Sequence, residues 1–223
     1  MIVPENIIEI CVAIDIAILG IAYPIIIDKI SNIGDKYSSE YIPVLFNKEF
    51  PQKNLKINSG NRLYNISIFN ITIYCTLTSF IFQIFEIPPP AKWDNWFINN
   101  SADYLTLFLT ILLIIFFFIW LNKVALYNGK SKSLLTHLIK NYNKSKSNPE
   151  TENYYIKAIN EITIYAIEKQ DEHLQETLLE FYYTVFANIR GKHDKSKPLV
   201  YPVDIYFLIN KINEIVAKDE NKT

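Results

Sequence analysis

One uninterrupted apolar stretch, Tyr104 to Asn122, constrains this chain more than any other feature. It holds nineteen residues between Asp103 and Lys123, and none of them carries a formal charge. A helix rises about 1.5 Å per residue, so a helix of this length matches a hydrocarbon core about 30 Å thick. The length and the charged flanks together favour a membrane-spanning helix over a buried helix of a soluble protein.

Two further segments have the length and composition of membrane spans. The first follows an N-terminal tail without lysine or arginine, whereas a cleavable signal peptide begins with basic residues, so we expect a retained helix. The second ends before Pro88, Pro89 and Pro90, which cannot continue a helix. We therefore expect three spans, at about 8–27, 63–86 and 104–122, with a polar loop at 28–62.

The basic residues predict the orientation of these spans. The N-terminal tail has none, residues 28–62 have six, residues 86–103 have one and residues 123–146 have six. Basic residues concentrate in cytoplasmic loops, so the N-terminus is expected outside and the C-terminus in the cytoplasm. Low arginine usage with many asparagines and isoleucines is typical of AT-rich bacterial genomes, and we expect a multi-pass protein of the bacterial cytoplasmic (inner) membrane.

The 28–62 loop contains apolar side chains within an otherwise polar composition. Two interpretations remain open: a short helix lying at the membrane interface, or an ordinary loop with a few buried anchors. The side chains that either interpretation uses are Tyr37, Tyr41, Leu45, Phe46 and Phe50. No stretch alternates regularly enough between apolar and polar residues to predict a sheet.

Beyond residue 127 the chain has the pattern of a soluble helical domain. Asn148, Pro149 and Glu150 form a typical helix start, Asp171 can cap the next helix, and Gly191 ends it. Helices are expected at about 131–142, 149–170, 171–190 and 202–218. The predicted fold is an all-α integral membrane protein, with a transmembrane domain at 1–127 and a small cytoplasmic bundle of helical hairpins at 128–223.

Apolar stripes at helical spacing predict the core of that bundle. They comprise Tyr155, Ile159, Ile162 and Ala166; Leu174, Leu178, Phe181, Val185 and Ile189; and Ile205, Ile209, Ile212 and Val216. Four further tyrosines, Tyr154, Tyr165, Tyr182 and Tyr183, fit either the core or a surface that packs against another subunit or a partner.

Polar and small residues within the predicted spans are the candidate functional positions. Asp15 is an ionisable group inside the first span, where it needs a partner or water unless it reaches the headgroups. Ala13, Ala17 and Gly20 form a small-residue ridge suited to helix packing. A polar stripe on the second span, either pore-lining or between helices, consists of Asn65, Thr72, Thr76, Ser79, Gln83 and Glu86. Trp93, Trp96 and Trp120 are the expected membrane-interface anchors.

The sequence offers no catalytic or metal-binding motif. The five glycines are scattered, so no phosphate-binding loop is present, and His137, His173 and His193 stand apart from one another. Cys11 and Cys75 lie in apolar stretches and predict no disulfide. With 22 basic and 23 acidic residues, the chain lacks the charge of a nucleic-acid-binding protein. We expect neither an enzyme nor a cofactor.

Two functions fit these features. The first is a small oligomeric membrane effector or channel-like assembly, a homo-oligomer in the lipid bilayer whose cytoplasmic helical domain senses or assembles. The alternative is a non-conducting membrane anchor or scaffold that presents the helical domain to a cytosolic protein partner. Three helices cannot enclose a pore alone, so the first function requires several subunits.

Overall fold

A computed structural model describes residues 5–49, 54–59, 62–84, 101–193, 196 and 198–220, which are predominantly helical. The chain divides into two compact units. The first unit comprises residues 1–32 and 46–125, and the second comprises residues 33–45 and 126–223.

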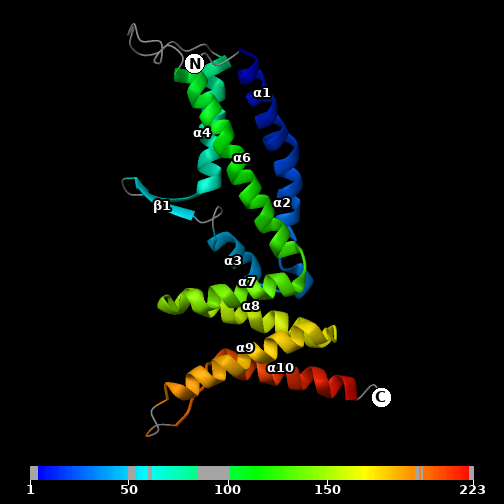
Figure 1. Ribbon diagram of the computed structural model, residues 1–223. Helices are drawn as coiled ribbons and strands as arrows, with labels where there is room; N and C mark the ends of the chain where they lie inside the picture. The colour runs from blue at the N-terminus through cyan, green and yellow to red at the C-terminus, as the bar shows by residue number, and fades with distance from the viewer. Residues whose placement is uncertain are drawn as a thin grey trace. The chain divides into compact units, whose positions relative to one another are not determined.

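The first unit is built around three helical stretches that lie side by side (Figure 1). The N-terminal stretch consists of α1 (Glu5–Ile16), a π-helical turn η1 (Ala17–Ala22) and α2 (Tyr23–Ser31). The others are α4 (Ile68–Ile84) and α6 (Ser101–Asn128), whose last residues belong to the second unit. Aromatic contacts join α2, α4 and α6 through Tyr23, Phe69 and Trp120.

Pro24 explains the π-helical turn in the N-terminal stretch. Proline has no amide hydrogen, and its ring clashes with the carbonyl four residues earlier, here that of Gly20. The backbone widens just before it, and the amide of Tyr23 donates to the carbonyl of Ile18, five residues earlier. The extra residue rotates the helix after Asp15, so a wheel drawn for a continuous α-helix misplaces Gly20 relative to Asp15.

A β-hairpin precedes α4, and the expectation of no sheet is wrong at this point. Strands β1 (Asn54–Ser59) and β2 (Arg62–Ser67) pair antiparallel, with Ser59 opposite Arg62. Asn65 therefore lies on a strand, opposite Lys56, and does not continue the helical stripe of Thr72. The sequence between the paired ends is Gly-Asn, which is typical of two-residue hairpin connections.

Two helices among the described residues are long and apolar enough to cross a membrane. They are Ile8–Tyr37, with 30 residues, and Ser101–Asn128, with 28. Only 17% and 28% of their most apolar windows are buried, unlike the core helix of a soluble protein. The expected span at 63–86 is shorter in the structure, because α4 begins after the hairpin and has 17 residues.

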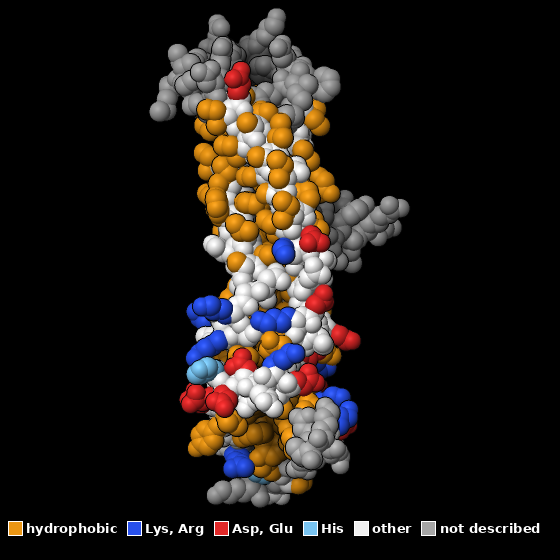
Figure 2. Space-filling view, turned by 90° about the vertical axis from the view of Figure 1, so that its right-hand side faces the viewer, with side chains coloured by type: hydrophobic (Ala, Val, Ile, Leu, Met, Phe, Trp, Pro, Cys, Tyr) orange, Lys and Arg blue, Asp and Glu red, His pale blue; other side chains and the backbone are white. Residues whose placement is uncertain are grey.

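One side of α6 faces the interior, and its buried residues follow alternating spacings of four and three. These residues are Thr106, Thr110, Leu113, Phe117, Trp120, Val124 and Tyr127. The outer side exposes Phe108, Ile115 and Phe118. Figure 2 shows that the surface formed by α1, α2 and α6 is hydrophobic and almost without charge.

The second unit contains α7 (Ser131–Lys144), a 3-10 turn η3 (Ser145–Ser147), α8 (Pro149–Glu168), α9 (Glu172–Gly191) and α10 (Val203–Glu220). Asn148 caps α8 by accepting from the amide of Thr151 at 3.2 Å, and Asp171 caps α9 by accepting from the amide of Leu174 at 3.1 Å. Helix α8 is central and contacts α7, α9 and α10. These helices begin and end within three residues of the expected positions.

The core of the second unit uses the expected stripes on α8 and α9. All four positions on α8 are buried, and so are Leu174, Leu178, Phe181 and Val185 on α9. The prediction for α10 is wrong at Ile209 and Val216, whose side chains are 45% and 47% exposed, because Ile205 and Leu208 fill the core instead. Ile205 and Leu208 are three residues apart and define the buried face of α10, and Ile209 lies beside this face rather than on it.

Part of the 28–62 loop belongs to the second unit. It forms a 3-10 turn η2 (Asp35–Tyr37) and the helix α3 (Tyr41–Lys48), and the chain passes back into the first unit within α3. Tyr37, Leu45 and Phe46 are buried, whereas Phe50 lies outside the described residues. The segment thus combines a short helix with the buried anchors that both interpretations used.

Candidate functional site

The first unit encloses a carboxylate that lacks a charged partner within the described part of the chain. Asp15 on α1 is only 4% exposed. Its Oδ2 accepts a hydrogen bond from the Thr110 hydroxyl on α6 at 3.0 Å, while no hydrogen bond reaches Oδ1 from the described residues. Cys11, one turn earlier, is also buried and shares Thr110 as a hydrogen-bond partner. Helices α1 and α6 thus meet through polar groups.

Threonines extend this arrangement into a buried set that we call the polar interior: Asp15, Thr72, Thr76, Thr106 and Thr110. Thr72, Thr76 and Thr106 donate to carbonyls of their own helices, at 2.9 to 3.1 Å. Such bonds satisfy each hydroxyl hydrogen and leave the oxygen able to accept. The polar interior therefore offers acceptors and one carboxylate within an apolar helical unit.

The polar stripe predicted on the second span is resolved at two of its positions. Thr72 and Thr76 face inward with Phe69, at the spacing expected for one helical face. Ser79 and Gln83 lie on α4, but their side chains are outside the described residues, as is Glu86 altogether. The two described threonines are buried within their own unit, and Thr76 also borders a pocket beside Asp15.

A pocket of about 290 Å³ opens beside the carboxylate. Its lining residues are Asp15, Ile16, Leu19, Gly20, Thr76 and Leu77. Gly20, expected on a packing ridge with Ala13 and Ala17, lines this pocket together with Asp15, as the π-helical turn allows. Ala13 and Ala17 are exposed on the apolar surface of the first unit.

Trp120 is fully buried in an aromatic cluster with Tyr23 and Phe69. The ring centroids lie 5.4 Å from Tyr23 and 4.7 Å from Phe69. Its side chain therefore packs the interior of the first unit, whatever depth it takes in a bilayer. Trp93 and Trp96, the other expected interface anchors, lie outside the described residues.

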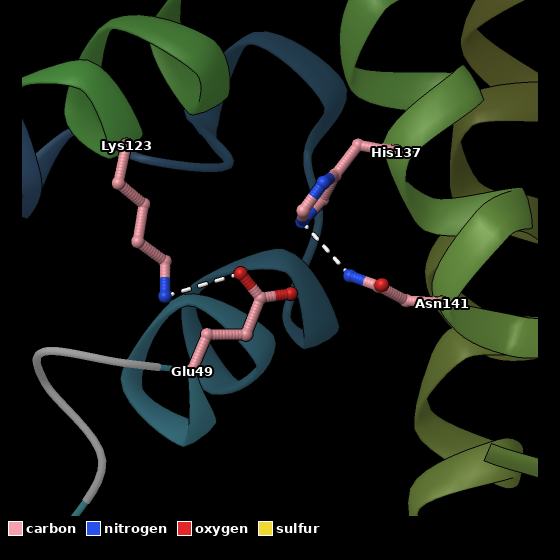
Figure 3. A network of polar contacts seen from close by, with 4 residues as sticks. All are labelled: Glu49, Lys123, His137 and Asn141. Carbon is pink, nitrogen blue, oxygen red and sulfur yellow. Dashed lines mark hydrogen bonds and ion pairs between the residues drawn. The ribbon is translucent and has the colours of Figure 1, made fainter. Parts of the chain in front are cut away.

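A buried ion pair lies near the end of the first unit. Lys123 on α6 is bonded to Glu49 at 3.1 Å, and its ammonium lies 5.2 Å from the centre of the Phe46 ring (Figure 3). Pairing and the aromatic face compensate the lost hydration of the ammonium group. Separately, within the second unit, Asn141 is 2.9 Å from the Nε2 of His137, one helical turn away on α7 (Figure 3). Both contacts are structural.

The second unit holds its own partly buried carboxylate, Glu161 on α8. It accepts from the Ser39 hydroxyl and from the backbone amide of Glu40 at 3.2 Å, and Ser39 in turn caps α3 by accepting from the amide of Ile42. Burial raises the pKa of the Glu161 carboxyl, and these hydrogen bonds oppose that effect. This contact connects the 33–45 segment to the helical bundle.

Of the four tyrosines expected either in the core or at a contact surface, three contribute to packing in the second unit. Tyr165 meets Tyr37 edge to face with centroids 4.9 Å apart, Tyr154 lies beside Tyr41, and Tyr182 donates to Asn160 at 2.6 Å. Tyr183 is 77% exposed and lies one turn from exposed Leu179 on α9, while α10 exposes Phe207. Within the described residues, these three side chains are exposed.

Sequence reasoning missed Thr106 and Thr110. Two threonines four residues apart interrupt an otherwise aliphatic and aromatic run, and that spacing was the available signal for a buried polar face on α6. Within the described residues, no three histidine, cysteine or acidic side chains gather as metal ligands. Comparison with protein-family models, curated proteins and solved structures finds no match.

Proposed function

We propose that this chain is a multi-pass membrane protein that acts as an oligomeric membrane effector or channel-like assembly. The observation that carries the proposal is the polar interior of the first unit inside an apolar outer surface. Soluble monomers rarely expose so large a hydrophobic surface, whereas lipid tails cover it without cost. Ionisable groups inside such a unit are expensive and usually functional.

The membrane arrangement that we propose has three spans, with α4 as the second. The 28-residue α6 extends about 42 Å at 1.5 Å per residue, more than a hydrocarbon core needs. The 17-residue α4 extends about 26 Å and would span a core about 30 Å thick with a slight local thinning. The exposed Ala13 and Ala17 on α1 would let another subunit approach closely.

The second unit would follow in the cytoplasm, on the bacterial inner-membrane side, and serve sensing or assembly. Its caps and core are those of a compact helical bundle, and its charged surface suits water. In this proposal the lipid bilayer and further copies of the chain are the partners, and no nucleic acid is involved.

A mass measurement and a flux measurement on the full chain test this function. In mild detergent, light scattering should give a multiple of 26.1 kDa after detergent correction. In vesicles, wild-type protein should release trapped ions faster than the Asp15→Asn variant, while Thr136→Val, a change at an exposed threonine on α7, should match wild type. A monomer would refute the channel-like assembly.

The anchor or scaffold function remains the second candidate, because α9 and α10 expose Tyr183, Leu179 and Phe207. Aromatic anchors of this kind are enriched at protein interfaces. An oligomer that conducts no ions with its trigger present, but loses a cytosolic partner upon Tyr183→Ser, would favour the scaffold.

A further inference from the structure

Among the described residues, Asp15 is a buried ionisable side chain whose hydrogen-bonding capacity is only partly used. The Thr110 hydroxyl donates a hydrogen bond to Oδ2, but Oδ1 is buried and receives no hydrogen bond from the described residues. No ion pair reaches the carboxyl within that part of the chain. An ionised carboxylate without a cation in apolar surroundings is costly, whereas its protonated form is not.

The groups around Asp15 favour a proton over a metal ion. Thr76 and Thr110, which face it from α4 and α6, do not titrate, and Cys11 is the titratable side chain that the structure places beside it on α1. One carboxylate and two hydroxyls fall short of the six to eight oxygens that calcium takes. The remaining lining of the pocket, apart from Gly20, is aliphatic.

The pocket supplies a route for the proton. Its volume of about 290 Å³ exceeds the roughly 30 Å³ share of one water molecule, and Asp15 and Thr76 provide polar partners for water. The wall beside Gly20 is open, since a methyl group added there would meet no atom within 4 Å. The π-helical turn that brings Gly20 to this wall is a feature frequently found at functional sites.

We propose that Asp15 is a reversible proton-binding site that exchanges with water through this pocket. A hydronium ion gives its proton to the carboxyl: one O–H bond of the hydronium ion breaks, an O–H bond forms on the carboxyl, and neutral water leaves. Oδ2 keeps its hydrogen bond from Thr110. The inference rests on the proposed function only in that the first unit lies in a bilayer.

Labelling with dicyclohexylcarbodiimide tests the site in the full chain in vesicles. This apolar reagent enters lipid and adds across the O–H of a protonated carboxyl, and peptide masses locate the adduct. We expect an adduct on Asp15 that decreases as pH rises, that is lost in Asp15→Asn and that Asp103→Asn leaves unchanged. Because the adduct is located on wild-type protein, the test does not depend on any variant folding.

Three results would overturn the proposal. They are an Asp15 that is never labelled in folded protein, labelling that does not change with pH, and protection by sodium or potassium at constant pH and ionic strength, which would indicate a metal cation site. Labelling of Asp15 requires neither an oligomer nor ion flux through it. A labelled Asp15 in an oligomer that conducts no ions with its trigger present would refute the channel and keep the proton site. Ion flux without labelling of Asp15 would keep the channel and refute the proton site.

Discussion

At Glu161 a single carboxyl holds the start of α3 against α8, and burial raises its pKa above the ordinary value of 4.5. The folded protein therefore holds this proton more tightly than the unfolded chain does. The contribution of Glu161 to the free energy of unfolding is therefore complete below pH 4.5 and is lost as pH rises from 4.5 through the raised pKa. Ionisation of Glu161 thus weakens the connection between the 33–45 segment and the bundle.

Replacement of Glu161 by glutamine should remove this pH dependence. Glutamine can still accept from the amide of Glu40, so the fold is retained and urea unfolding becomes less sensitive to pH above 4.5. Glu161→Ala should cost about 1–3 kcal/mol, because the buried hydroxyl of Ser39 loses its acceptor. Glu168→Gln, at an exposed position on α8, is the control. Equal pH slopes for wild type and Glu161→Gln would contradict the expectation.

At the scale of the helix, α10 provides adjacent positions on opposite sides of the core boundary. Leu208 is buried, while Ile209 is largely exposed. Leu208→Ala should lower the free energy of unfolding by about 2–5 kcal/mol, because it leaves a cavity, whereas Ile209→Ala should change it by less than about 1 kcal/mol. Leu178→Ala on α9, at 2% exposure, should resemble Leu208→Ala. Urea titrations of the full chain in detergent compare the three. A larger loss at Ile209 than at Leu208 would show that α10 is rotated about its axis.

At the scale of the whole molecule, the number of spans decides on which side each connection lies. Three spans place residues 53 and 146 in the cytoplasm and residue 100 outside. Reporter fusions after Lys53, Asn100 and Lys146 should therefore read inside, outside and inside. If the first two report the same side, α4 does not span the membrane. If the last two agree, α6 does not.

Local signals in the sequence were sufficient for the helices of the second unit. Asn148, Asp171 and Gly191 mark helix ends because capping depends on a few neighbouring residues. The stripes of α8 and α9 indicate their buried faces because polar residues occupy the opposite faces. On α10, apolar residues lie on more than one face, so periodicity alone misplaced the boundary at Ile209.

The sequence by itself determined that α6 is a long apolar helix and where the helices of the second unit begin and end. It also identified Asp15 as an ionisable residue within the apolar N-terminal stretch. Only the tertiary structure decided which side of α6 is buried, because apart from Thr106 and Thr110 the middle of the helix is apolar all round and its apolar residues have no helical period. The partner of Asp15, Thr110, is 95 residues away, and Glu161 lies 122 residues from Ser39. Such pairings arise from the packing of distant segments, whereas propensity, capping and periodicity act over only a few turns.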